Sequence, residues 1–204
     1  MSLPAFYESA PRIVMRDALA ETLGAAEGGL IEYGYADAVR LAGHSCPTVA
    51  GAWLMARAAV RALYPDAVGE RGAIAVTMSA PEDEGTTGVI AQVFTLVTGA
   101  AANNGFHGIA GRFVRDGLLA YGSGDSDSIA SFRRVDTGAT VDVAMDLSAV
   151  QPAPLMRVLM QRALAPDATA VERKTFADVW QERVRRLLHE HADDANTIRV
   201  THRA

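Results

Sequence analysis

The stretch G-H-S-C-P-T-V-A-G-A, residues 43–52, holds the only cysteine of the 204-residue chain and places a histidine two positions before it. Pro47 suits the first position of a helix, so Cys46 is predicted to lie at the helix N-cap. The free amides and the dipole of a helix N-terminus favour a thiolate there. If the preceding segment is extended, His44 and Cys46 point to the same side, because side chains alternate along an extended chain.

Three interpretations of this pair remain open. His44 and Cys46 could bind zinc or another divalent transition metal, or they could form a thiolate and imidazolium pair with Cys46 as the nucleophile. The third interpretation is a capped helix start with a packed thiol and a hydrogen-bonded histidine. A metal would need further ligands, and the candidates are His107, in the loop N-N-G-F-H-G-I-A-G, and the acids of residues 82–84.

Gln92 is the one long polar side chain within the apolar run Val89 to Val97. A buried amide needs hydrogen-bond partners, so Gln92 is expected either to face a cleft or to bond across an interface. It is therefore a candidate for binding a cofactor or ligand.

The period of the apolar residues predicts the elements that position these side chains. Helices are expected over residues 13–23, 36–42, 48–64, 86–98, 154–164 and 170–191, and strands over 72–80, 131–135 and 141–145. The dipeptide Asp116-Gly117 predicts a hairpin between residues 109–114 and 118–121, since Asp-Gly supplies the positive φ angles of a type I′ turn. Strands and helices do not alternate regularly, so the fold class is α+β, with helices packed on an antiparallel sheet.

A shift in composition near Pro152 separates a core of residues 1–150 from a helical extension of residues 151–204, which would pack on the core or on a dimer partner.

Composition narrows the class of protein. Half of the residues are hydrophobic and the formal net charge is −5, which argues against a nucleic-acid binder, because phosphate neutralisation needs clustered Lys and Arg. The sequence has no secretory leader pattern and no run of 18 apolar residues, so a cytosolic protein without a membrane segment is expected. One cysteine excludes an intramolecular disulfide and a multi-cysteine zinc finger.

Two blocks of the sequence resemble the FmdE-like family, named after a protein associated with formylmethanofuran dehydrogenase of methanogens. The first is A-D-A-V-R-L-A-G-H-S-C-P-T-V-A-G-A-W-L-M, matching the family's short helix, its G-H-x-C-P and its long Ala-rich helix. The second is G-V-I-A-Q-V-F-T-L-V-T-G-A-A-A-N-N-G, matching a helix with a glutamine followed by T-G and a glycine-bearing loop. The resemblance covers about residues 33–121, and the threonine after the proline is more typical of a bacterial branch than of the methanogen proteins.

The resemblance implies an α+β core that forms intertwined dimers, with His44 and Cys46 in a cleft that holds a metal. Gln92 stands where the family often has its glutamine. The sequence departs from the family at three places. Thr86 and Val89 stand where many relatives have a second cysteine and an aspartate, and Asn103-Asn104-Gly105 stands where they have Gly-Lys-Gly. The C-terminal zinc finger of some relatives is missing. A homodimer that binds a small-molecule ligand, with zinc at the Cys/His site, is therefore the leading expectation. A metal-free thiol enzyme and a non-catalytic assembly protein are the alternatives.

Overall fold

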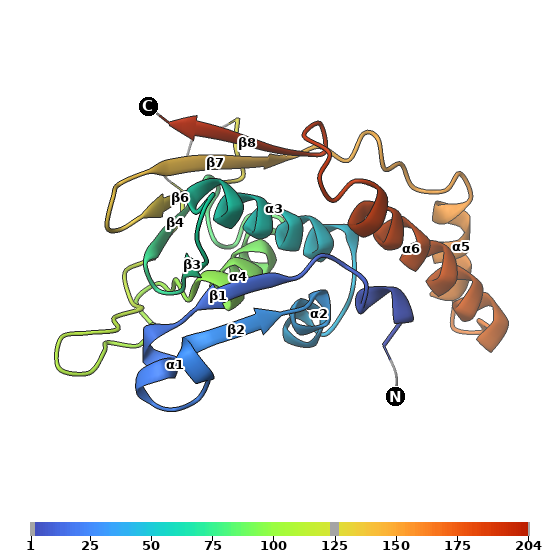
Figure 1. Ribbon diagram of the computed structural model, residues 1–204. Coiled ribbons are helices and arrows are strands. Elements are labelled where there is room, and N and C mark those ends of the chain that lie inside the picture. The colour runs from blue at the N-terminus through green and yellow to red at the C-terminus, as the bar shows by residue number, and fades with distance from the viewer. Residues whose placement is uncertain (1–2, 123–126, 204) are drawn as a thin grey trace.

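The computed structural model describes residues 3–122 and 127–203 and confirms an α+β fold (Figure 1). The larger sheet has the strand order β5-β4-β6-β7-β8, and its neighbours are antiparallel except for β4 and β5, which run parallel. Its strands are β4 (Ile74–Met78), β5 (Leu119–Ala120), β6 (Ala130–Arg134), β7 (Thr140–Met145) and β8 (Ile198–Arg203). In the smaller sheet, β1 (Ile13–Arg16) pairs antiparallel with β2 (Leu30–Tyr33) and parallel with β3 (Gly69–Glu70). Both sheets are thus mixed.

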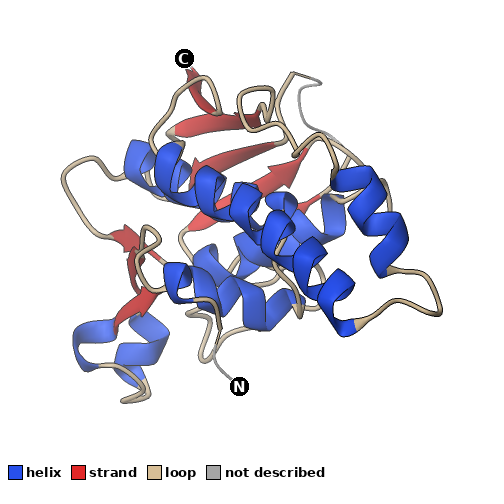
Figure 2. Ribbon diagram, turned by 90° about the vertical axis from the view of Figure 1, so that its right-hand side faces the viewer, coloured by secondary structure: helices blue, strands red, loops and turns tan. Residues whose placement is uncertain are grey.

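The helix α3 (Pro47–Leu63) forms the centre of the molecule. It is buried along most of its length and packs on β7 and β8 of the larger sheet, on α4 (Thr87–Thr98) and on α6 (Ala170–Glu190). Small residues allow this close packing: a Cβ atom added at Gly51 would lie 1.9 Å from the Sδ atom of Met145 on β7. Figure 2 shows the long helices lying side by side against the strands.

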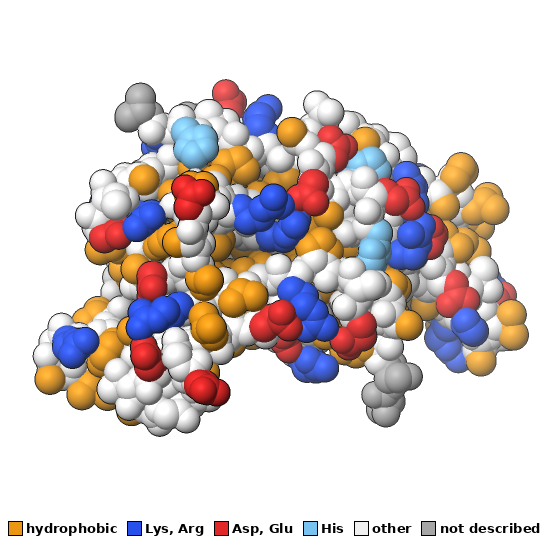
Figure 3. Space-filling view, viewed as in Figure 1, with side chains coloured by type: hydrophobic (Ala, Val, Ile, Leu, Met, Phe, Trp, Pro, Cys, Tyr) orange, Lys and Arg blue, Asp and Glu red, His pale blue; other side chains and the backbone are white. Residues whose placement is uncertain are grey.

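Alternation along the strands gives the larger sheet two different faces. Its inner face is buried against the helices, through side chains that include Ile74, Phe132 and Val141. The opposite face carries small and polar side chains, among them Asp142 and Thr201. In the view of Figure 3, Lys and Arg are interspersed with Asp and Glu rather than gathered into a patch of one sign.

The segment after residue 150 forms α5 (Met156–Ala163), α6 and the edge strand β8 (Figure 1). The C-terminal half of α6 packs on the body of the molecule through its buried side chains Val184, Leu187 and Leu188. The helix α5 packs on α6 and projects from the body. The strand β8 was not predicted. The division into a core of residues 1–150 and an extension of residues 151–204 stays a prediction, and the structure adds that this extension supplies the edge of the larger sheet.

Two sequence predictions about local structure are wrong. Residues 13–23 do not form one helix: Ile13 and Met15 are buried on one side of the strand β1, and Asp17 then caps the short helix α1 (Ala18–Thr22). The hairpin around Asp116-Gly117 does not form either. Ala110 and Phe113 adopt positive φ angles, so residues 109–114 turn tightly instead of extending, and β5 pairs parallel with β4.

The remaining predicted helices and strands are present with small changes at their ends, including α2 (Tyr35–Ala42) ahead of the Cys/His segment. Two short 3-10 helices, Ala5–Tyr7 and Glu27–Gly29, also lie ahead of α2 in the chain. Within residues 3–122 and 127–203, none of the helices has both the length and the hydropathy needed to cross a bilayer.

Candidate functional site

Cys46 occupies the N-cap of α3, as predicted. Its backbone is extended, with φ −149° and ψ 168°, and Pro47 takes the first helical position. The Sγ atom accepts a hydrogen bond from the backbone N–H of Val49 at 3.4 Å. The thiol sulfur therefore lies among the amides that a helix N-terminus leaves without an intrahelical partner, where negative charge is stabilised.

His44 lies beside this sulfur. Gly43 ends α2 in the left-handed conformation, with φ +73°, and the chain then runs through His44 to Cys46. The Nε2 atom of His44 is 3.5 Å from the Sγ atom of Cys46, and the Nδ1 atom is 3.0 Å from the carbonyl oxygen of Ala42. Because a carbonyl only accepts, Nδ1 carries the hydrogen, and in the neutral ring the lone pair of Nε2 faces the sulfur.

The spacing of the two atoms fits two kinds of chemistry. Zinc holds a thiolate sulfur at about 2.3 Å and an imidazole nitrogen at about 2.0–2.1 Å, which at a tetrahedral angle separates them by about 3.5–3.6 Å. The observed 3.5 Å is thus the separation at which both atoms could ligate one ion. The same distance fits a hydrogen bond from the thiol to the imidazole, which is the starting arrangement of an activated cysteine. His44 is exposed and Cys46 is half-buried, so a ligand can reach both.

His107 has a different environment. Its side chain is 79% exposed, and its Nδ1 atom lies 3.1 Å from the Oδ2 atom of Asp116. Over residues 3–122 and 127–203, no group of three or more His, Cys, Asp or Glu side chains is arranged to hold a metal ion. The described part of one chain thus brings His44 and Cys46 together, and does not add His107 or the acids of residues 82–84 to them.

Gln92 lines a separate cavity. It is exposed on α4, between the buried residues Ala91 and Val93, so the expectation of a buried amide is wrong. Gln92 lines a cleft, and a hydrogen bond across an interface between chains stays a prediction. The cavity has a volume of about 430 Å³, and its lining includes Arg71, Glu82 and Tyr121 but neither His44 nor Cys46. Burial, and then the negative charge of Glu82, raise the pKa of the Tyr121 hydroxyl.

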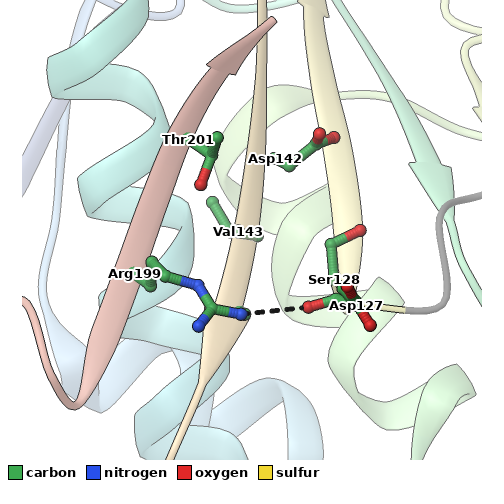
Figure 4. Close-up of a pocket in the computed structure, with 7 residues that line it drawn as sticks. Asp127, Ser128, Asp142, Val143, Arg199 and Thr201 are labelled. Atoms are coloured by element: carbon green, nitrogen blue, oxygen red, sulfur yellow. Dashed lines mark hydrogen bonds between the residues drawn. The ribbon is translucent and has the colours of Figure 1, made fainter.

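A second cavity, of about 340 Å³, lies on the face of the larger sheet that is turned away from the helices (Figure 4). Asp142 of β7 and Thr201 of β8 line it together with Arg199, whose Nη2 atom donates to the carbonyl oxygen of Asp127 at 3.2 Å. Asp142 is already engaged, since it accepts hydrogen bonds from Ser131 and Arg203. This cavity is polar and shares no lining residue with the Cys/His pair.

Sequence reasoning missed the residues that hold the turn between His44 and Cys46. The carbonyl oxygen of Ser45 accepts hydrogen bonds from Trp180 Nε1 at 3.0 Å and from Gln181 Nε2 at 3.2 Å, both on α6. The Ser45 hydroxyl lies 2.8 Å from the hydroxyl of Tyr35, a fully buried side chain on α2. Burial raises the pKa of Tyr35, while the bond to Ser45 opposes this rise. The available signal was the indole and amide of Trp180-Gln181 on the same helix as the apolar residues that pack on α3.

Comparison of the sequence with models of protein families gives no match, and a search of curated proteins gives none. The resemblance to the FmdE-like family therefore rests on the two sequence blocks alone and stays a prediction.

Proposed function

We propose that this chain binds a divalent transition metal, zinc in the first instance, through the Sγ atom of Cys46 and the Nε2 atom of His44. The observation that carries the proposal is the 3.5 Å separation of these two atoms, which is the separation that tetrahedral zinc needs. The hydrogen bond from His44 Nδ1 to the Ala42 carbonyl supports it, because metal-binding histidines usually donate their second ring nitrogen in this way.

Two side chains leave coordination positions for other groups. Water, a small-molecule ligand or a residue of a second chain would complete the shell. Bound zinc with an open position supplies Lewis acidity, which lowers the pKa of bound water and polarises carbonyl groups. In this protein His44 and Cys46 fix the metal at the start of α3, and the exposure of His44 gives a ligand access. The reduced thiol that such a site requires is consistent with a cytosolic protein.

A homodimer belongs to the same proposal. Several apolar side chains on and around α5 are at least 60% exposed, namely Leu155, Val158, Leu164 and Val171. Exposed apolar side chains gathered in one region are typical of a contact surface. Sedimentation velocity with the purified protein tests this: a single species of about twice the chain mass of 21.6 kDa is expected.

A metal-free thiol enzyme is the second candidate, and the N-cap geometry favours it specifically. The Val49 amide and the dipole of α3 stabilise a thiolate without any metal. The proton of the Cys46 thiol would pass to Nε2 of His44, leaving a thiolate nucleophile and an imidazolium. The same two residues thus serve both candidates, and the metal content of the protein separates them.

The experiment is metal analysis of the protein purified without added metal and after dialysis against zinc. About one equivalent of zinc per chain is expected for the natural protein, and less than a tenth of that for Cys46→Ser and for His44→Gln. His189→Gln is the matched control, because His189 is also exposed and also places a ring nitrogen 3.0 Å from a backbone carbonyl, that of Phe6. Zinc retained by Cys46→Ser would contradict the proposal. A metal-free protein whose cysteine is alkylated rapidly below pH 7 would favour the thiol enzyme, and a metal-free protein with a slowly reacting thiol would favour an assembly role.

A further inference from the structure

We propose that Trp180 and Gln181 of α6 are positioning residues for the Cys46 and His44 side chains, and that they act through the carbonyl group of Ser45. This inference rests on the proposed function in so far as it takes the Cys/His pair to be the chemical site. It assigns a role to two residues that lie 135 and 136 positions from Ser45 in the sequence.

The Ser45 carbonyl belongs to the peptide group that joins Ser45 to Cys46. Trp180 Nε1 and Gln181 Nε2 donate to its oxygen at 3.0 and 3.2 Å, which uses both lone pairs of that atom. A peptide group is planar, so fixing its oxygen from two directions also fixes the position of the Cys46 Cα atom. The sulfur can then move only by rotation about the N–Cα bond and about χ1. The start of α3 at Pro47 holds the first rotation, and the bond from Val49 selects one rotamer of the second.

The amide of Gln181 is itself held in one orientation. Its Oε1 atom accepts a hydrogen bond from the Tyr7 hydroxyl at 2.9 Å, which turns the Nε2 atom towards Ser45. The ring of Tyr7 packs edge-on against the ring of Tyr35, with 5.0 Å between the centroids, and Tyr35 holds the Ser45 hydroxyl. Tyr7 and Tyr35 are both buried. Ser45 is therefore fixed at its side chain by α2 and at its carbonyl by α6.

The docking of α6 does not depend on these two hydrogen bonds. Its buried apolar contacts come from Val184, Leu187 and Leu188, further along the helix, whereas Trp180 and Gln181 are only half-buried. Removal of the two donors is thus expected to leave α6 in place and to release the peptide between Ser45 and Cys46. The observable consequence is a looser spacing of the Cys46 sulfur and the His44 nitrogen.

The test uses the double variant Trp180→Phe/Gln181→Met, which removes both donors and places an apolar side chain at each position. The matched control is Gln151→Met, because Gln151 also donates from its side-chain amide to a backbone carbonyl, that of Ser148 at 2.9 Å, away from the contacts that hold Ser45. Zinc affinity is measured by competition with a chromogenic chelator. The pH profile of iodoacetamide alkylation is measured on the metal-free protein, where Cys46 is the only thiol that can react.

For Trp180→Phe/Gln181→Met we expect a zinc affinity about tenfold lower than that of the natural protein, the effect typical of losing groups that orient a metal ligand. We also expect a displaced midpoint in the pH profile of alkylation. The control variant should keep the zinc affinity and the alkylation midpoint of the natural protein, whatever its thermal stability. A folded Trp180→Phe/Gln181→Met protein with unchanged zinc affinity and an unchanged pH profile would overturn the inference.

The two proposals fail in different ways. If the natural protein binds no zinc, the metal proposal fails, while the alkylation profile still decides whether Trp180 and Gln181 position the thiol. If the double variant does not fold, the two single variants carry the test, since each keeps one donor to Ser45. Each single variant should then show a smaller loss of zinc affinity, or a smaller shift of the pH profile of alkylation, than is expected for the double variant. If both single variants keep the natural zinc affinity and the natural pH profile, the inference is contradicted.

Discussion

The substitution Asp17→Asn is expected to destabilise the protein strongly at neutral pH. Asp17 is buried at the start of α1. Its Oδ1 atom accepts from Arg115 Nη2 at 2.7 Å, and its Oδ2 atom accepts from Arg71 Nη1 at 2.9 Å. The same carboxylate caps α1 by accepting from the backbone amides of Leu19 and Ala20. The Asp17 carboxylate thus pairs with two guanidinium groups and also caps a helix.

The magnitude follows from the burial of the partners. The side chains of Asp17 and Arg115 are 5% and 9% exposed, so Asp17→Asn leaves a guanidinium charge without its counter-charge in a place that water hardly reaches. Breaking a buried pair from one side costs about 3–5 kcal/mol. Asparagine retains the helix cap, and Arg71 is partly exposed, so we expect a loss of about 3 kcal/mol in the free energy of unfolding.

The pH dependence has a definite sign. Burial by itself raises the pKa of Asp17, but the hydrogen bond from Arg71, the charge of Arg115 and the amides of α1 outweigh it and lower the pKa overall. A carboxyl group whose pKa is lower in the folded state stabilises that state above its unfolded pKa of about 3.9. This contribution is lost as the pH falls from there through the folded pKa. The difference between the natural protein and Asp17→Asn should therefore shrink below about pH 4.

The assay is urea unfolding followed by circular dichroism at pH 7 and at several values below pH 4. Asp37→Asn is the control: Asp37 also accepts a backbone amide at a helix start and pairs with an arginine, Arg40, but its side chain is 36% exposed. A loss of no more than about 1 kcal/mol is expected for this control. If Asp17→Asn costs as little as Asp37→Asn, or if its effect is constant down to low pH, the reasoning from a buried ion network is refuted.

Three further predictions follow from other parts of the chain. Gly105→Ala should cost about 1–3 kcal/mol in urea unfolding, because its Cβ atom would lie 2.5 Å from the backbone nitrogen of Asp116, and an unchanged stability would contradict this. Thr169→Ala should remove the N-cap of α6 and lower the free energy of unfolding by about 1 kcal/mol in the same assay. A loss below about 0.3 kcal/mol would contradict this prediction. An NMR titration should give Glu172 a midpoint near pH 2, because hydrogen bonds from the backbone amide of Thr169, the side chain of Arg162 and the hydroxyl of Thr169 lower its pKa to about 2. A midpoint above about pH 4 would show that these hydrogen bonds are absent in solution.

The sequence predicted those parts of the fold that depend on local signals. Pro47 and the small residues after it predicted the start of α3, and with it the N-cap position of Cys46. The run over residues 86–98 is rich in β-branched residues, yet its length and the glycine after it correctly indicated a helix, which Gly99 ends in the left-handed conformation. That His44 and Cys46 lie on the same side was predictable, because side chains two residues apart point the same way along an extended chain.

The missed features depend on contacts between distant segments. In residues 13–16 the apolar side chains fit a helix as well as a strand, and only pairing with β2 and β3 decides between them. The strand β8 carries charged residues and has only two buried or half-buried aliphatic side chains, Ile198 and Val200, so its pairing with β7 decides its conformation. The sequence shows two donors at Trp180 and Gln181, but it does not show that Ser45 is their acceptor, because these hydrogen bonds exist only when α6 lies against the turn before α3.

The position of α6 and β8 near the end of the described chain has a consequence during synthesis on the ribosome. α6 and β8 both pack on α3, and β8 also covers the edge of β7, so these surfaces stay open until residues up to 203 have been translated. The nascent chain thus carries the Cys46 turn without the two donors that fix it in the finished protein. The Cys46 turn therefore takes its final form only after α6 has been translated, and until β8 follows the nascent chain offers an exposed strand edge.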